Sequence, residues 1–212
     1  MDAVLTATNA SMVFGLSSGA IVALETALAL PGRLSTVVLY EPPLLLDGLE
    51  HLAPKLAKFQ DEMSSGRVAA GMVTAMRLGQ FAPWWISGLP RPLLEALTWL
   101  ALHVDSGSRY PPLRDLALST RFDFALVFAS SATGVERFKG IGETGTKIML
   151  LGGSRSPAYL RKSLDALSRV LPNATKHEIP TAGHGASWNA DRGGSPGVVV
   201  PLVCEFLGAA TG

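Results

Sequence analysis

Apolar residues along the chain form short runs that predict strands alternating with helices. Three runs, Ser11 to Leu16, Leu34 to Tyr40 and Thr146 to Leu151, are almost continuously apolar, a pattern typical of strands covered on both faces. A more polar run, Ala174 to Ile179, predicts a fourth strand. Strands of this kind belong in a parallel sheet that lies between layers of helices.

Helical segments follow these strands. The segment that begins at Gly19 is rich in alanine and leucine and stops at Pro31 and Gly32, which terminate helices. Residues 157–171 have the spacing of an amphipathic helix, and residues 198–207 predict a closing helix. The order of elements therefore predicts the α/β class, with a mostly parallel sheet flanked by helices.

Residues 44–140 have a different character. Three stretches with helical spacing are separated by polar or proline-containing segments. This pattern predicts a mostly helical cap, or lid, inserted into an α/β core made of residues 1–43 and 141–212. Trp84 and Trp85 lie in the insertion, where they would either line an apolar substrate pocket or pack to hold the cap on the sheet.

The composition narrows the function classes. Apolar residues make up 48% of the chain, and the net charge of +1 argues against a nucleic-acid groove or a surface for anionic membranes. Cys204 is the only cysteine, so neither an intramolecular disulfide nor a cysteine-rich metal site is expected. No metal or other cofactor is expected, because His184 lacks a second ligand at metal-binding spacing. The start lacks the features of a signal peptide, and no apolar run is long enough to span a membrane, so we expect a soluble cytoplasmic protein.

A candidate nucleophile lies between the first strand and its helix. Gly15-Leu16-Ser17-Ser18-Gly19 matches the pattern G-x-S-x-G, in which a tight turn lifts the serine above the sheet. We expect both glycines to be required, because side chains there would collide with the crowded turn. The backbone N–H of Ser18, at a helix N-terminus, is placed to stabilise an oxyanion. The competing interpretation is a glycine-serine turn that only caps the helix.

The candidate base is His184. It follows the last predicted strand in Pro180-Thr181-Ala182-Gly183-His184-Gly185, on a loop at the sheet edge that also carries Ser17. His51 and His103 lie in the helical insertion, and His177 lies within a strand, so these three are poorer candidates.

The acid is less directly indicated. The strand before the last one ends in Gly152-Gly153-Ser154-Arg155-Ser156 without a carboxylate. Glu41 follows the strand next to the nucleophile, and an isolated glutamate between an apolar strand and two prolines needs a partner to offset its burial. Glu41 is therefore the first candidate to orient His184, and Asp123 is the second.

Together these pieces resemble the α/β-hydrolase family. The matching segments are VFGLSSGAIVALETAL, VVLYEPP, KIMLLGGSRSP and PTAGHGA, in this order. The resemblance implies a nucleophile elbow at Ser17, a histidine loop at His184 and a helical cap. Some relatives, including certain haloalkane dehalogenases, place a glutamate acid where Glu41 stands, but they use an aspartate nucleophile. A serine favours hydrolysis of small esters, thioesters or lactones.

This chain departs from the family pattern before the elbow. Family members have about four strands before the elbow, whereas only about ten residues precede the first strand here. The segment Met12 to Leu16 would then be an exposed apolar sheet edge that invites pairing with another subunit. The alternatives are a hydrolase whose start was misassigned, a fragment, or a shortened chain that forms a homo-oligomer. A non-catalytic binding or interaction module is the competing function.

Overall fold

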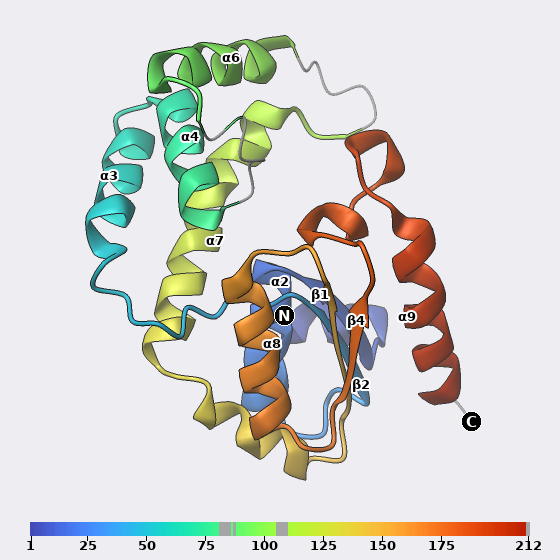
Figure 1. Cartoon of the computed structure of the whole chain (residues 1–212). Coiled ribbons are helices and arrows are strands. Elements are labelled where there is room, and N and C mark those ends of the chain that lie inside the picture. The colour runs from blue at the N-terminus through green and yellow to red at the C-terminus, as the bar shows by residue number, and fades with distance from the viewer. Residues whose placement is uncertain (81–85, 87, 105–109, 211–212) are drawn as a thin grey trace. The chain divides into compact units, whose positions relative to one another are not determined.

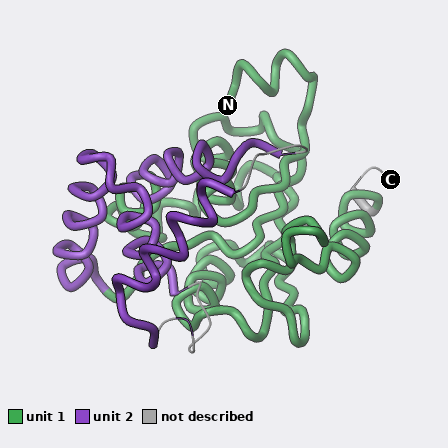
Figure 2. The backbone as a smooth tube through the Cα atoms, turned by 90° about the horizontal axis from the view of Figure 1, so that it is seen from above, with its two compact units in different colours: residues 1–47, 126–212 green, residues 48–125 purple. Residues whose placement is uncertain are grey.

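The computed structural model describes residues 1–80, 86, 88–104 and 110–210. The chain divides into two compact units (Figure 2). One unit combines residues 1–47 with 126–212 and contains the sheet, and the other comprises residues 48–125. Each unit is described by itself.

The sheet has four parallel strands among the described residues. They are β1 (Met12–Leu16), β2 (Thr36–Tyr40), β3 (Lys147–Gly153) and β4 (Thr175–Ile179), in the spatial order β1-β2-β3-β4. Leu16 is the register partner of Tyr40, and Tyr40 is the partner of Leu151, so the carboxyl ends of the first three strands are level. The expected α/β class with a parallel sheet flanked by helices is confirmed.

Helices cover both faces of this sheet (Figure 1). On one face, Ile21 of α2 and Leu164 of α8 share a core with Leu39 and Leu150 of the central strands. On the other face, Val199 of α9 packs with a smaller cluster that includes Tyr40 and Leu151. The helices of this unit are α1 (Asp2–Thr8), α2 (Ser18–Ala29), α8 (Ala158–Val170) and α9 (Pro196–Ala210), with the short helices η1 (Glu136–Glu143), η2 (His184–Ser187) and η3 (Ala190–Arg192).

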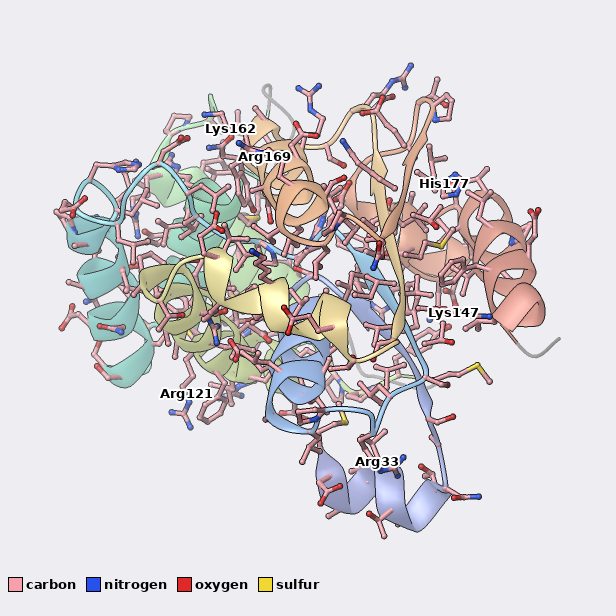
Figure 3. The ribbon with its side chains drawn as sticks, turned by 90° about the horizontal axis from the view of Figure 1, so that it is seen from below. Arg33, Arg121, Lys147, Lys162, Arg169 and His177 are labelled. Carbon is pink, nitrogen blue, oxygen red and sulfur yellow. The ribbon has the colours of Figure 1, made fainter. Side chains whose placement is uncertain are left out.

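The two outer strands of the described sheet differ in chemistry. On β1, Met12 is 40% exposed and Phe14 is 43% exposed, which gives this edge an apolar surface. On β4, residues 175–178 are exposed and polar, and His177 is one of them (Figure 3). Polar edge strands resist pairing with other chains, and apolar ones invite it.

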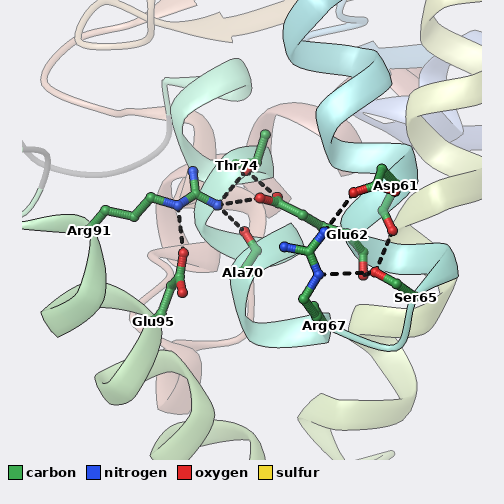
Figure 4. Close-up of polar contacts among 8 residues, drawn as sticks. All are labelled: Asp61, Glu62, Ser65, Arg67, Ala70, Thr74, Arg91 and Glu95. Carbon is green, nitrogen blue, oxygen red and sulfur yellow. Dashed lines mark hydrogen bonds and ion pairs between the residues drawn. The ribbon is translucent and has the colours of Figure 1, made fainter.

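The second unit is helical. It contains α3 (Ala53–Ser64), α4 (Val68–Gly79), α6 (Arg91–Val104) and the first part of α7 (Leu113–Ala132). Phe59 and Met63 of α3 pack with Ala75 of α4 in a small core. Beside this core, the buried Glu62 carboxylate accepts hydrogen bonds from Arg91 at 2.6 Å and from Thr74 at 2.5 Å (Figure 4).

The observed boundaries differ from the expected 44–140. Residues 126–140 lie with the sheet unit, because Val127 of α7 and Phe138 of η1 belong to the core on the sheet. Two helices, α1 and α7, were not expected from the sequence. No helix in the described part of the chain is both long and apolar enough to cross a membrane.

Candidate active site

Ser17 occupies a sharp turn between β1 and α2. Its backbone angles are φ 53° and ψ −122°, outside the regions that residues with a side chain usually adopt. The next residue, Ser18, begins α2, and the carbonyl of Ser17 accepts the N–H of Ala20 at 2.9 Å. A serine in a strained strand-to-helix turn has the geometry of a nucleophile elbow.

The two glycines of the turn do different things. A Cβ atom on Gly15 would lie 2.6 Å from both the Cα of Ala20 and the carbonyl oxygen of Gly19, so only glycine allows the helix to start this close to the strand. A Cβ atom on Gly19 would meet no described atom within 4 Å, apart from its neighbours and its own helix. The expectation that crowding requires both glycines is therefore wrong for Gly19.

Backbone hydrogen bonds extend the sheet past its last regular residues. The N–H of Ser17 donates to the carbonyl of Tyr40 at 2.9 Å, and the N–H of Glu41 donates to the carbonyl of Leu151 at 3.0 Å. Ser17 and Glu41 therefore leave the same edge of the sheet from neighbouring strands, and the turn after β3 lies beside Glu41.

Glu41 and His184 are in direct contact. The carboxylate oxygen Oε2 of Glu41 lies 2.7 Å from Nδ1 of His184. The Glu41 side chain is 1% exposed and the His184 side chain is 10% exposed. The structure thus brings together the candidate base and the first candidate for the acid. Asp123, the second choice, belongs to the helical unit.

The other carboxylate oxygen of Glu41 has two donors. Oε1 accepts the backbone N–H of Gly153 at 2.6 Å and the hydroxyl of Ser156 at 2.5 Å. Such hydrogen bonds offset the cost of burying a carboxylate. The sequence showed a serine where an acid was sought after β3, but the contact between Ser156 and Glu41 was missed. It joins residues 115 positions apart, and the sequence offers no local signal for it.

The loop that carries His184 is anchored on two sides. The Tyr40 hydroxyl donates to the carbonyl of Gly183 at 2.8 Å. From the turn after β3, the Ser154 hydroxyl accepts the N–H of Thr181 at 2.9 Å. These contacts anchor the loop backbone on both sides of Ala182.

Two buried tyrosines feel the negative charge of Glu41. Burial raises the pKa of Tyr40, and the negative charge of Glu41 raises it further. The pKa of Tyr159 on α8 is raised by the same two causes in the same order. Both phenols therefore keep their protons to a more alkaline pH than an ordinary tyrosine does, and Tyr40 serves as a hydrogen-bond donor.

The remaining candidates lie elsewhere. His51 and His103 belong to the helical unit, and His177 is exposed on β4. Trp84 and Trp85 fall outside the described residues.

The chain was compared with known protein families, sequences and structures. No protein-family model matches the chain, and no curated protein sequence matches it. Among solved structures, an alpha/beta hydrolase from Sphaerobacter thermophilus DSM 20745 matches 96% of this chain and 70% of its own, with a TM-score of 0.65 and 20% identity. The chain has the α/β-hydrolase fold.

Other structures with the α/β-hydrolase fold match in the same way. The enzyme MGS-M2, from a Medee basin deep-sea metagenome library, has a TM-score of 0.59 and 17% identity over 98% of this chain and 69% of its own. The enol-lactonase from Burkholderia xenovorans LB400 has a TM-score of 0.57 and 14% identity over 96% of this chain and 68% of its own. In the α/β-hydrolase fold the nucleophile sits on a strand-to-helix turn, as Ser17 does here.

Proposed function

We propose that the chain is a serine hydrolase that acts on small carboxylic esters, thioesters or lactones. The observation that carries this proposal is the buried Glu41 carboxylate, 2.7 Å from Nδ1 of His184, at the sheet edge from which Ser17 projects. An acid, an imidazole and an elbow serine are the three groups that nucleophilic acyl transfer needs.

Each group has a distinct role in the proposed reaction. Ser17 Oγ attacks the carbonyl carbon, and Nε2 of His184 takes the hydroxyl proton. Glu41 accepts the Nδ1–H of His184, which fixes the tautomer with Nε2 as the base and stabilises the imidazolium that forms. His184 then gives the proton to the leaving alcohol or thiol. A water, activated in the same way, releases the acid from Ser17.

The start of α2 supplies half of the proposed oxyanion hole. Ser18 is the first residue of α2, so its N–H belongs to the helix terminus that carries positive potential. In this fold the nucleophile's following residue provides one oxyanion donor. Loss of a single oxyanion donor typically costs about 100- to 1000-fold in turnover, so the Ser18 N–H would contribute strongly to the rate.

The names of similar structures support an ester-type substrate class. The enol-lactonase has a TM-score of 0.57, and a structure from a study of carboxylesterases in Nitrososphaera gargenis has one of 0.54. Both names describe cleavage of carboxylic esters, cyclic or open. This is the reaction we propose for Ser17, and Trp84 and Trp85 are our proposed substrate-pocket residues.

Covalent labelling tests the proposal most directly. A fluorophosphonate transfers its phosphorus to an activated serine oxygen and releases fluoride, while the serine proton is taken by the base. We expect one adduct per chain by intact-mass measurement, and none in Ser17→Ala. Ser154→Ala, which leaves Ser17 and Glu41 in place, serves as the matched control and should label normally. A folded protein without an adduct, or an adduct that persists in Ser17→Ala, contradicts the proposal.

One observation favours an alternative. The apolar residues Met12 and Phe14 on β1 form an exposed sheet edge, which would suit a module that pairs with another subunit. Such a module would be a homo-oligomer whose mass falls to that of one chain in Met12→Glu, and it would not react with fluorophosphonates.

A further inference from the structure

Ser156 is buried next to Glu41, the proposed acid, but it is not itself the proposed nucleophile, base or acid. It is 4% exposed and lies in the turn between β3 and α8, three residues after Gly153. Its hydroxyl is 2.5 Å from Oε1 of Glu41, and its backbone N–H donates to the carbonyl of Gly153 at 3.1 Å. A buried hydroxyl aimed at a buried carboxylate is a charge-assisted hydrogen bond, the stronger kind.

We propose that Ser156 is a positioning residue that aims the Glu41 carboxylate at His184. The inference deepens the proposed function and rests on it. Ser156 and Gly153 both donate to Oε1, whereas His184 contacts Oε2. Rotation of the carboxylate about its last bond would break these contacts together. The hydroxyl therefore holds Oε2 on Nδ1 and, through it, the imidazole in its working orientation.

The turn that carries Ser156 is rigid enough for this task. A Cβ atom on Gly153 would lie 2.3 Å from the carbonyl oxygen of Ala182, so the turn and the histidine loop touch backbone to backbone. The N–H of Arg155 donates to the same carbonyl at 2.9 Å. A rigid support fixes the donor to Glu41 relative to the loop of His184, which is what precise orientation of a catalytic group requires.

Ser154 offers a matched control in the same turn. Its hydroxyl accepts the N–H of Thr181 at 2.9 Å, so it supports the loop backbone rather than the carboxylate. Ser156→Ala and Ser154→Ala each remove one hydroxyl from neighbouring positions. If the hydroxyls only stabilise the turn, both variants should weaken it. Only Ser156→Ala removes a hydrogen bond that orients the Glu41 carboxylate.

The first readout is the rate constant of fluorophosphonate labelling, together with kcat and KM for an activated ester. We expect Ser156→Ala to lower the labelling rate and kcat by about 10-fold, equivalent to about 1.4 kcal/mol of transition-state stabilisation, with KM nearly unchanged. Ser156→Thr, which keeps a hydroxyl, should recover most of the rate, and Ser154→Ala should stay within about twofold of the parent chain. Equal rates in Ser156→Ala and the parent chain overturn the inference.

The second readout does not depend on activity. A proton on Nδ1 of His184 that is held by Glu41 gives a downfield NMR signal, which is assigned by its loss in His184→Gln. We expect this signal to move or broaden in Ser156→Ala and to persist in Ser154→Ala. If the signal is the same in both variants, Ser156 has only a structural role. A parent chain with the NMR response but without labelling would instead contradict the proposed function alone.

Discussion

Ser17 and Glu41 leave neighbouring strands at the same level of the sheet, and both adopt positive φ angles, 53° and 48°. Such angles cost residues with a side chain on the order of 1 to 3 kcal/mol each. The cost is met by the surrounding structure, because the N–H of each residue is bonded to the next strand. Strained backbone often clusters at active sites, and here it sets the direction of a hydroxyl and a carboxylate on neighbouring strands.

The acid assignment predicts different outcomes for two carboxylates. Glu41→Gln should lower kcat by about 1000-fold or more, because an amide cannot stabilise the imidazolium of His184 and favours the wrong tautomer. Asp123→Asn, in the helical unit, should stay close to the parent rate. Steady-state hydrolysis of an activated ester measures both. If the order of the two effects is reversed, Asp123 is the acid.

The elbow predicts opposite tolerance at its two glycines. Gly15→Ala should destabilise the fold by about 3 kcal/mol or more, because the added methyl group would lie 2.6 Å from the backbone of α2. Gly19→Ala has space for its Cβ and replaces a helical glycine, so its stability should be unchanged or raised by up to about 1 kcal/mol. Urea unfolding monitored by circular dichroism measures both. Equal stabilities would show that the strand and helix are not packed this closely.

Two ion pairs of the helical unit should differ in their contribution to stability. Arg91→Met leaves the Glu62 carboxylate, 2% exposed, without its counter-charge and should cost about 3 kcal/mol. Arg67→Met breaks a pair with Asp61 in which both side chains are more than half exposed, and should cost less than about 1 kcal/mol. Chemical unfolding gives both values, and similar losses would contradict the burial of Glu62.

Tyr40 and Tyr159 predict that the free energy of unfolding decreases at alkaline pH. The pKa values of Tyr40 and Tyr159 are raised in the folded chain, so the folded state holds these protons more tightly than the unfolded state does. Their contribution is fully present below the unfolded pKa of about 10 and is lost as the pH rises above it. Tyrosinate absorbance during an alkaline titration should show two phenols that ionise late, and Tyr40→Phe and Tyr159→Phe should each remove one. Ionisation of every tyrosine near the ordinary value would contradict their burial beside Glu41.

Local patterns in the sequence were enough to predict the sheet and to single out the candidate residues that the structure brings to one sheet edge. Continuous apolar runs identified β2 and β3, and the glycine-flanked Ser17 between a strand and a helix identified the elbow. Glu41 was found by asking what a buried carboxylate needs, and the structure places its partner, His184, 2.7 Å away. Each of these inferences used either neighbouring residues or the shared edge of parallel strands.

Other features depended on contacts that no local pattern shows. The role of Ser156 comes from a hydrogen bond across 115 residues, and the open space at Gly19 comes from the direction in which its Cβ would point. Helix α7 was missed because its apolar residues, among them Leu126 and Val127, do not keep a clean helical period along the segment. Its second half packs on the sheet core, which also moves the boundary of the helical unit.

Tyr40 and Glu41 are adjacent in sequence, yet they hold the histidine loop at two points, the backbone of Gly183 and the ring of His184. Among the described residues, the hydrogen bonds to Glu41 all come from the sheet unit. The contact between Glu41 and His184 is thus set within one unit, by Tyr40 and Glu41 at the end of β2 together with the turn after β3. Sequence change within residues 48–125 can therefore proceed, over evolutionary time or in a library, without rebuilding the parts that would move protons.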